Sequence, residues 1–312
     1  MHELVAEVWR SDFLESVHHG SVVALDASGA ASISVGQPGL PMFPRSSNKP
    51  LQAVGMVRRG LELDGELLAL ACSSHSGEAF HIDGVRRILA GAARSERDLR
   101  CTEGLPIGER ALRRHLAGGG SAAPLYMNCS GKHAAMIATC VRNDWPVDTY
   151  LSPEHPLQRA IRDTVEDLAG ERVAAVGVDG CGAPLFALTL TGLARAFGRI
   201  AASSAGTVEH RVASAMRAHP EWVGGTGRDV TTLMRAVAGA VAKDGAEGVY
   251  AVGLPTGAAV AVKIADGSGR ARAVVAAAAL ARVGVPDGQL RDLATAPVLG
   301  HGQPVGAVRA VI

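Results

Sequence analysis

Lysines are rare among the basic side chains of this sequence. Of 31 basic residues only four are lysines, namely Lys49, Lys132, Lys243 and Lys263. A lysine amine can lose its proton in a desolvated pocket and then act as a base or a metal ligand, whereas an arginine guanidinium stays charged. Lys49, Lys132 and Lys263 lie in or beside short motifs and are interpreted as functional. Lys243, in Ala-Lys-Asp-Gly, is interpreted as a surface residue.

The first motif is Ser46-Ser-Asn-Lys49, directly ahead of an apolar stretch. Residues three apart share one face of a helix, so Ser46 Oγ and Lys49 Nζ can meet. A neutral lysine that takes the serine proton turns the hydroxyl into a nucleophile, and serine β-lactamases and penicillin-binding proteins use this Ser-x-x-Lys arrangement. The same letters also fit a capping serine followed by an exposed lysine, so the pattern alone leaves both interpretations open.

A second polar cluster, Ser74-His75-Ser76 with Glu78, follows an apolar run. Hydroxyl, imidazole and carboxylate groups so close together can relay protons or hold a substrate. The string also fits a helix N-cap followed by a glutamate. We favour the functional interpretation because so many polar groups are crowded into it.

Two cysteines and a lysine indicate a metal site or a nucleophile. Asn-Cys129-Ser-Gly-Lys132-His133 opens an apolar helix, and Asp179-Gly-Cys181 follows a β-branched segment. A helix dipole stabilises a thiolate at the helix N-terminus, so Cys129 is a candidate ligand or nucleophile. Zinc normally binds Cys, His or carboxylate, so Lys132 would have to bind as the neutral amine, and His133 is a competing ligand. The alternative is two structural thiols and a surface lysine.

A glycine-rich segment ending at Arg228 is a candidate anion site. Glycines at a helix start expose backbone N–H groups to an anion such as a carboxylate, and Arg228 could pair with it bidentately. On these residues alone a plain glycine turn is the better interpretation. Lys263 lies in an apolar strand segment, where burying its charge is costly, so it is expected to face a cleft or to be neutral.

These motifs need a scaffold that brings distant segments together. Alternating apolar residues predict strands near both ends of the chain, and helical periodicity predicts helices between them. The predicted strands cover residues 4–9, 21–25, 31–35, 173–178, 249–254, 258–264 and 305–312. The predicted helices cover residues 52–59, 62–72, 81–93, 107–116, 130–143, 155–169, 185–201, 207–218 and 270–283. We therefore predict an α+β fold in which both ends of the chain build one sheet that helices cover.

The overall composition describes an ordinary globular protein, with 47% hydrophobic and 20% charged residues and a net charge of +1. Basic residues are scattered among acidic ones, which argues against nucleic-acid binding. No export signal and no uninterrupted apolar run of about 18 residues is found, so no membrane contact and a cytoplasmic location are expected. The five cysteines are odd in number and irregularly spaced, which favours reduced thiols.

Taken together, these segments resemble the asparaginase II family, the L-asparaginases of the Rhizobium etli type. The matching segments run in the same order from about residue 12 to 267, and the Asn-Cys-Ser-Gly-Lys-His string is much more specific than Ser-x-x-Lys. The residues that carry the resemblance are Arg45, Ser46, Lys49, Ser74, His75, Ser76, Asn128, Cys129, Lys132, His133, Asp179, Cys181, Gly225, Arg228 and Lys263. The resemblance implies one catalytic domain over residues 1–312 with an α/β sandwich fold of the serine β-lactamase and penicillin-binding-protein type, its antiparallel sheet formed by both termini.

The resemblance also implies hydrolysis of L-asparagine to aspartate and ammonia by a homodimer. The residues that it assigns to catalysis are Ser46, Lys49, Ser74 and Lys263. The residues that it assigns to substrate binding are Arg45, His75, Ser76, Asp179 and Arg228. By the same resemblance, a zinc ion that orients the substrate would be held by Cys129, Lys132 and Cys181. One departure from the wider fold is that Ile-Ala follows Lys263, where β-lactamases have Lys-Thr-Gly.

The expected mechanism is a two-step acyl transfer. Neutral Lys49 takes the proton of Ser46, whose oxygen attacks the side-chain amide carbon, while Ser74 relays protons and the charge of Lys263 lowers the pKa of its neighbours. Ser46 and Ser74 could exchange roles. The alternatives are a β-lactam-recognising hydrolase on the same fold, a non-catalytic zinc-binding protein, and an enzyme that prefers glutamine. The missing export signal and the missing Lys-Thr-Gly argue against the first of these.

Overall fold

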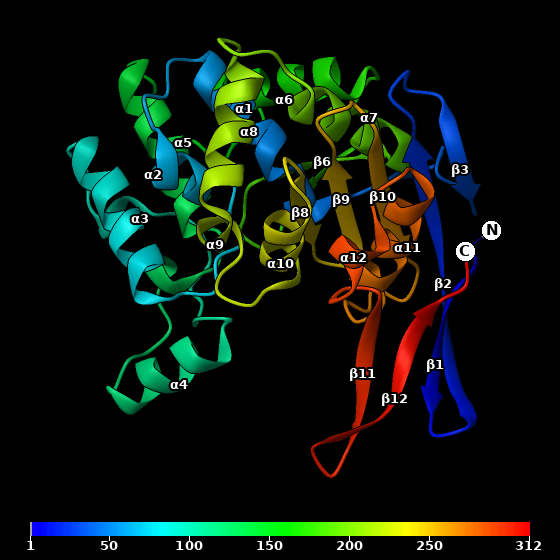
Figure 1. Cartoon of the computed structure of the whole chain (residues 1–312). Helices are drawn as coiled ribbons and strands as arrows, with labels where there is room; N and C mark the ends of the chain where they lie inside the picture. Colours follow the sequence, from blue (N-terminus) through cyan, green and yellow to red (C-terminus); the bar gives the residue numbers. More distant parts are fainter. Residues whose placement is uncertain (1) are drawn as a thin grey trace.

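The computed structural model describes residues 2–312 and has an antiparallel sheet with helices packed against part of it (Figure 1). The sheet consists of β1 (Glu3–Arg10), β2 (Phe13–Leu25), β3 (Ala31–Val35), β8 (Val241–Gly245), β9 (Val249–Gly253), β10 (Ala259–Ile264), β11 (Thr295–Gly300) and β12 (Gln303–Ala310). Its order is β11-β12-β1-β2-β10-β9-β8, and β3 pairs with β2. Two short ribbons are β4 (Pro41–Met42) with β7 (Leu188–Thr189), and β5 (Val176–Val178) with β6 (Pro184–Phe186).

The two ends of the chain run side by side in the sheet. Ala6 of β1 lies opposite Ala310 of β12, and Val8 lies opposite Val308, in an antiparallel pairing. On its other edge β1 pairs with β2, and the sheet continues through β10 and β9 to β8. The predicted α+β fold class is therefore confirmed, with a sheet that both termini build. That one catalytic domain spans residues 1–312 stays a prediction.

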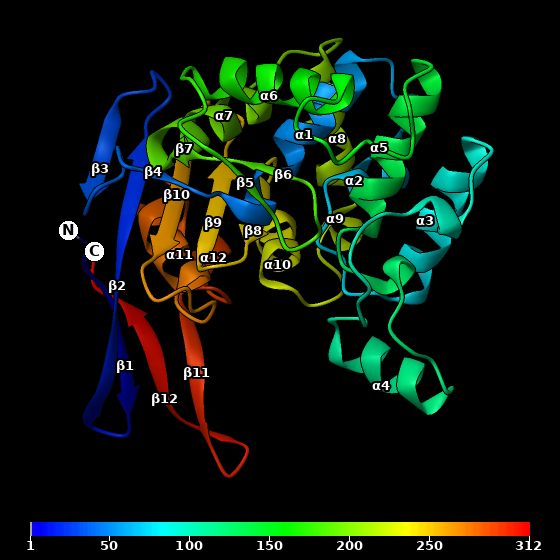
Figure 2. The same cartoon turned by 180° about the vertical axis from the view of Figure 1, so that it is seen from behind.

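Helices cover both faces of this sheet. The longer helices are α1 (Lys49–Arg58), α2 (Gly65–Ala71), α3 (Ala79–Gly91), α4 (Glu109–Ala117), α5 (Ser130–Arg142), α6 (Pro156–Ala169), α7 (Leu190–Ala201), α8 (Val208–Ala218), α10 (Asp229–Ala236) and α11 (Arg272–Arg282). The short ones are η1 (Arg45–Asn48), η2 (Glu96–Asp98), η3 (Pro124–Tyr126), α9 (Pro220–Val223) and α12 (Asp287–Leu290). Every residue of β8 and β9 is buried, because α7 and α11 pack against β9 and α7, α8 and α10 pack against β8 (Figures 1 and 2).

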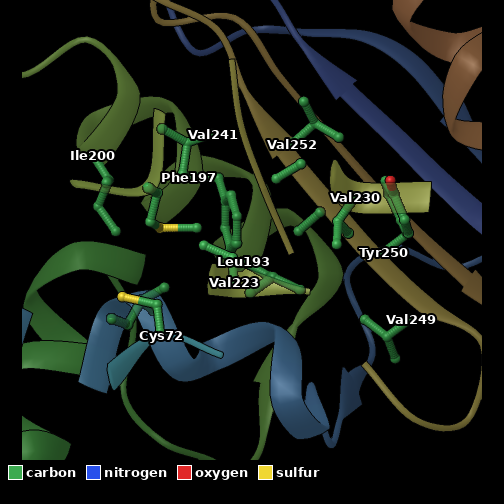
Figure 3. Packing of buried hydrophobic residues seen from close by; sticks show 14 of the residues in the cluster. Cys72, Leu193, Phe197, Ile200, Val223, Val230, Val241, Val249, Tyr250 and Val252 are labelled. Atoms are coloured by element: carbon green, nitrogen blue, oxygen red, sulfur yellow. The ribbon is translucent and has the colours of Figure 1, made fainter. Parts of the chain in front are cut away.

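The contact between α7 and β9 is very close. A Cβ atom on Gly253 would lie 2.1 Å from the carbonyl oxygen of Phe197, so only glycine fits at this strand position. Leu193, Phe197 and Val252 belong to one apolar cluster (Figure 3). This packing fixes β9, and through its pairing also the terminal strand β8.

The remaining helices form a second body beside the sheet. Helix α1 lies in its middle and packs against α5, α6 and α8. Just before α1, η1 contacts β8 and β9, so the Ser46 turn lies where the helical body meets the terminal strand of the sheet (Figure 1). Within residues 2–312, no helix combines the length and the apolar character that crossing a membrane requires.

The structure departs from the predicted elements mainly in short strands. Strand β8 was not predicted, because a segment that contains Lys-Asp-Gly lacks the apolar alternation of a strand. Strand β11 was not predicted either. The helix predicted over residues 185–201 begins at Leu190, because residues 184–189 are used by β6 and β7.

Three segments extend beyond the compact part of the molecule (Figures 1 and 2). The β1–β2 and β11–β12 hairpins project together, and α4 projects separately. No residue of α4 is buried. The segment that contains α4 is closed at its base by an antiparallel bridge between Gly104 and Ala123. Their N–H groups donate to each other's carbonyls at 3.2 and 3.0 Å.

Candidate active site

Lys49 lies at the start of α1 and is buried. Pro50 follows it in the first helical turn, where no backbone donor is needed. The lysine is 1% exposed. Its Nζ donates to Ser73 O at 2.5 Å and to Ser74 Oγ at 3.0 Å, and it lies 3.1 Å from Cys129 Sγ. One amine therefore joins the serine of the second motif to the cysteine of the third.

Ser46 lies in η1, three residues before Lys49, and is partly exposed. It follows Arg45, whose backbone is in the left-handed region with φ at 52°. Within the described part of the chain, the hydrogen bonds of Lys49 Nζ go to other groups and none goes to Ser46. The sequence spacing suggested that Ser46 Oγ and Lys49 Nζ can meet, but the amine turns inward, where buried acceptors surround it.

Arg45 and Asp179 tie the Ser46 turn to the Cys181 turn. Arg45 Nε donates to Asp179 Oδ1 at 2.8 Å, and the same oxygen accepts from Gly180 N at 2.9 Å. The Asp179 side chain is only 10% exposed, so water weakens this charged pair little. Two residues predicted to bind substrate are thus brought together at the site, while their contact with substrate stays a prediction.

Ser74, His75 and Ser76 form a buried segment after α2. His75 Nε2 lies 2.8 Å from Ser130 Oγ, whose own hydrogen goes to a backbone carbonyl, so Nε2 is the donor. Burial lowers the pKa of His75 well below its ordinary value, and the ring is neutral. Ser76 Oγ donates to Gly224 O at 3.0 Å. His75 and Ser76 therefore hold the surrounding framework in place, and of the three only Ser74 hydrogen-bonds Lys49.

The thiol groups of Cys129 and Cys181 gather around the Lys132 amine. Cys129 is the N-cap of α5 and Lys132 follows in the first turn, while Cys181 lies between β5 and β6. Lys132 Nζ is 3.1 Å from Cys181 Sγ, which is 3.8 Å from Asp179 Oδ2. All three predicted ligands are at most 3% exposed. The structure brings them together and connects them to Lys49 through Cys129.

The charges in this cluster are paired. A hydrogen bond with Cys129 and the nearby Lys132 charge lower the pKa of Cys181 far below its ordinary value despite burial. The hydrogen bond with Cys181, together with burial, raises the pKa of Cys129, which stays a thiol. Burial lowers the pKa of Lys132, but the two sulfur atoms and Asp179 outweigh it and raise that pKa overall.

The donor set fits a zinc ion only if the lysine takes part. Across residues 2–312, no group of three or more His, Cys, Asp or Glu side chains is arranged to hold a metal. The competing ligand His133 directs its Nδ1 to Tyr150 OH at 2.7 Å. Cys129, Lys132 and Cys181 do converge, and two sulfurs with an amine suit zinc once Lys132 has released its proton.

Lys243 is not a surface residue, and that interpretation is wrong. It lies on β8 and is 0% exposed. A Cβ on Gly245, two residues later, would lie 2.6 Å from Pro44 O, so the end of this strand lies against the Ser46 turn. Burial lowers the pKa of Lys243 to about 8, and the charge of nearby Lys49 adds to this shift. Two of the four lysines therefore face the same buried region.

The sequence does contain a signal for this residue. Lys243-Asp-Gly differs at one position from the Lys-Thr-Gly strand element of β-lactamases, and it lies on a terminal strand beside a Ser-x-x-Lys turn. A search for that motif with one mismatch, combined with the rarity of lysine, would have found it. The motif was compared with Lys263 instead.

Lys263 lies two strands away, on β10. Its Nζ donates to Glu247 O and Ile264 O, both at 2.6 Å. Among the described residues it makes no hydrogen bond to Ser46 or to the side chains around Lys49. Lys263 is therefore not hydrogen-bonded to the other predicted catalytic residues, and its catalytic role stays a prediction, while Lys243 lies buried near the strand end that meets the Ser46 turn.

Arg228 precedes α10 and is already engaged by a carboxylate, because its Nη2 donates to Asp244 Oδ2 at 2.7 Å. In the preceding glycine segment, Gly225 has φ at 128°, and a Cβ there would lie 2.1 Å from Ser76 Oγ. The close approach of Ser76 thus explains why position 225 is a glycine. A cleft of about 420 Å³ opens beside Ser76 and is lined by Thr226, Gly227 and the start of α4.

The family can be decided from the sequence over nearly its whole length. The profile of the family described as L-asparaginase II matches residues 6–310. The chain belongs to the L-asparaginase II family. The predicted family is thereby confirmed, and membership in the L-asparaginase II family implies an amidohydrolase that acts on a small molecule.

Comparisons with solved structures and with curated proteins say less about function. Among solved structures, a beta-lactamase from Mycobacterium bovis is similar at 13% identity, covering 85% of this chain and 95% of that chain with a TM-score of 0.48. No curated protein matches the sequence. For this member of the L-asparaginase II family, the roles of individual residues therefore have to be argued from its own geometry.

Proposed function

We propose that the protein is an L-asparaginase that hydrolyses L-asparagine to L-aspartate and ammonia through a serine ester. The observation that carries the proposal is the environment of Lys49, a buried amine 3.0 Å from Ser74 Oγ and three residues after the partly exposed Ser46. A buried lysine among neutral partners can release its proton and serve as a base, as serine nucleophiles require. Family membership makes an amide the expected bond to be cleaved.

Ser46 is the proposed nucleophile. It is the more exposed of the two serines, since Ser74 is 4% exposed and already hydrogen-bonded to Lys49. The Ser46 proton passes to neutral Lys49, directly or through Ser74, as Ser46 Oγ bonds to the side-chain amide carbon. Lys49 then protonates the departing ammonia, and water hydrolyses the resulting ester. Contacts that are long in the free enzyme can tighten when the substrate binds.

Lys243 supplies a positive charge at this site. The amine of Lys243 interacts electrostatically with that of Lys49, which contributes to lowering the pKa of Lys243. The same charge attracts the negative oxygen that develops when the amide is attacked. The role of a local positive charge, which was expected of Lys263, is thus proposed for Lys243, because Lys263 hydrogen-bonds two backbone carbonyls elsewhere.

Replacing Ser46 by alanine tests this proposal directly. We expect Ser46→Ala to lower kcat for ammonia release from asparagine by at least about 10³-fold, because no ester can form. Ser74→Ala should cost about 100-fold, since it removes only a proton relay. Rapid quenching and mass spectrometry should find the aspartyl ester on the peptide with Ser46. An ester on Ser74, or near-normal turnover by Ser46→Ala, would refute the assignment.

We also propose that Cys129, Lys132 and Cys181 hold a zinc ion. When bound there it would supply a positive charge that orients the amino-acid head group of the substrate. Arg45 and Asp179 adjoin this cluster and would align the same head group. A homodimer and a cytoplasmic location stay predictions.

Metal content tests the zinc assignment. We expect about one zinc per chain in the purified protein and a loss of that metal in Cys181→Ser, because a thiolate ligand is removed. Cys140→Ser is the matched control, since Cys140 is a buried thiol on the same helix as Lys132 and lies outside the ligand set. Binding should weaken as the pH falls, because protons compete for the ligands. Equal zinc in both variants would exclude this site.

A further inference from the structure

A buried carboxylate beside Lys243 has an unusual number of cationic partners. Asp244 is 5% exposed. Its Oδ2 accepts from Arg228 Nη2 at 2.7 Å and from Arg272 Nη2 at 3.0 Å, and its Oδ1 accepts from the Lys243 amine. Three cations thus share one carboxylate group, which has no contact with Ser46 or Ser74 of its own.

The partners of Asp244 come from three separate elements. Arg228 is the N-cap of α10, Lys243 lies on β8, and Arg272 begins α11. Arg272 also donates to Gly245 O at 2.9 Å and to Asp229 Oδ2 at 3.1 Å. Because two guanidinium groups from different helices hold Oδ2, the carboxylate has one fixed orientation.

The Lys243 amine is bonded to its own neighbour in the strand. Successive residues on a strand point to opposite faces, yet the Lys243 amine donates both to the carbonyl at 2.8 Å and to the carboxylate of Asp244. β8 is a terminal strand of the sheet, and η1 rather than a further strand lies against it.

We infer that Asp244 is a positioning residue: its carboxylate, oriented by Arg228 and Arg272, holds the Lys243 amine charged and fixed beside Lys49. The inference rests on the proposed function only in that Lys243 serves the proposed site. Asp244 itself touches no reacting atom. Its effect is to keep a cation at the end of β8, where burial would otherwise favour the neutral amine.

The charged groups around Lys243 and Asp244 determine in which direction the pKa of Lys243 moves when Asp244 is replaced. The groups that face Lys243 are Asp244, Lys49, Arg228 and Cys72. Those that face Asp244 are Lys243, Arg272, Arg228, Asp229 and Tyr250. Burial brings the pKa of Lys243 down to about 8 while Asp244 opposes the shift. Without the carboxylate charge, burial and two cations act unopposed, so the pKa must fall further.

Because the chain has only four lysines, the pKa of Lys243 can be measured without any activity assay. Selective ¹³Cε labelling of lysine gives four side-chain resonances, and Lys243→Arg identifies one of them. We expect Lys243 to titrate near 8 in the parent protein and at least about one pH unit lower in Asp244→Asn, since that change keeps the shape and removes the charge. Asp229→Asn is the matched control, because Asp229 contacts Arg272 but not Lys243, and it should leave the titration in place.

A second variant keeps the test valid if Asp244→Asn does not fold. Arg228→Gln retains a donor for Asp244 and removes a cation that lowers the pKa of Lys243, so this pKa should rise. An unchanged Lys243 titration in every folded variant at positions 244 and 228 would overturn the inference. If the pKa moves as expected in a protein that hydrolyses no asparagine, the positioning role stands and only the proposed function fails.

Kinetics supply the second measurement. If charged Lys243 is required, the fall of kcat/KM at alkaline pH should move to lower pH in Asp244→Asn, with kcat more affected than KM. A merely structural role would lower the whole profile without moving it. A profile that keeps its shape in Asp244→Asn and in Asp229→Asn alike would therefore also contradict the inference.

Discussion

Lys243→Met is expected to lower kcat for asparagine hydrolysis by at least about 100-fold, the usual cost of removing one stabilising charge from an active site. Lys243 is 0% exposed and its charge is close to Lys49. The matched control is Lys263→Met, which should stay within a few-fold of the parent protein, because Lys263 hydrogen-bonds only backbone carbonyls on β10 and the β8–β9 turn. An active Lys243→Met variant, or an inactive Lys263→Met variant, would reverse this assignment.

The same substitution should not destabilise the protein. The folded pKa of Lys243 is about 8 and its ordinary value is 10.5, so burying the charged amine costs on the order of 3 kcal/mol at neutral pH. Methionine avoids this cost, and Asp244 keeps Arg228 and Arg272 as partners. We expect Tm to rise by a few degrees at pH 7. The advantage should shrink between pH 8 and 10.5, because the unfolded chain binds more protons than the folded one in that window. Thermal unfolding across this range is the measurement.

Lys49→Arg is expected to lower kcat by about 10³-fold, within the usual range for loss of a general base. A guanidinium cannot release its proton at any working pH, so it cannot act as a base beside Ser74 Oγ. The measurement is steady-state ammonia release together with ester formation after rapid quenching. Both should decline in parallel, because the first proton transfer is lost.

The control for this exchange lies on the same helix. Arg58→Lys makes the reverse swap at an arginine of α1 that pairs with Asp167 and Glu209 near the surface. Surface pairs contribute at most about 1 kcal/mol, so activity should be unchanged. If Lys49→Arg kept more than about a tenth of the parent kcat, deprotonation of residue 49 would be unnecessary and another base would have to be found.

Most of the fold could be predicted from local patterns. The helices over α1, α3, α5, α6 and α8 carry apolar residues at helical spacing, and the strands at both ends alternate. What local pattern could not reveal is β8. This strand is buried and contains a lysine bonded to the neighbouring aspartate, whose other partners come from the starts of α10 and α11.

The candidate site could be predicted in its residue types but not in its pairings. The motifs correctly brought Cys129, Lys132 and Cys181 into one cluster. They did not indicate that Lys49 would contact Ser74 rather than Ser46, because a three-residue spacing says nothing about which buried acceptors attract an amine. Lys243 was missed because Lys-Asp-Gly has the composition of an exposed turn, and only the tertiary structure shows that it is covered.

The bridge between Gly104 and Ala123 gives α4 a narrow neck. No residue of α4 is buried, and besides this bridge the segment is tied to the body where the N–H of Gly108 donates to Ser76 O at 2.9 Å, so the helix is a peripheral insertion. Relatives could exchange it for a short turn or a larger insert without changing the core. An engineer could graft a binding peptide or a label at this neck, on a rigid support and at a distance from the sheet.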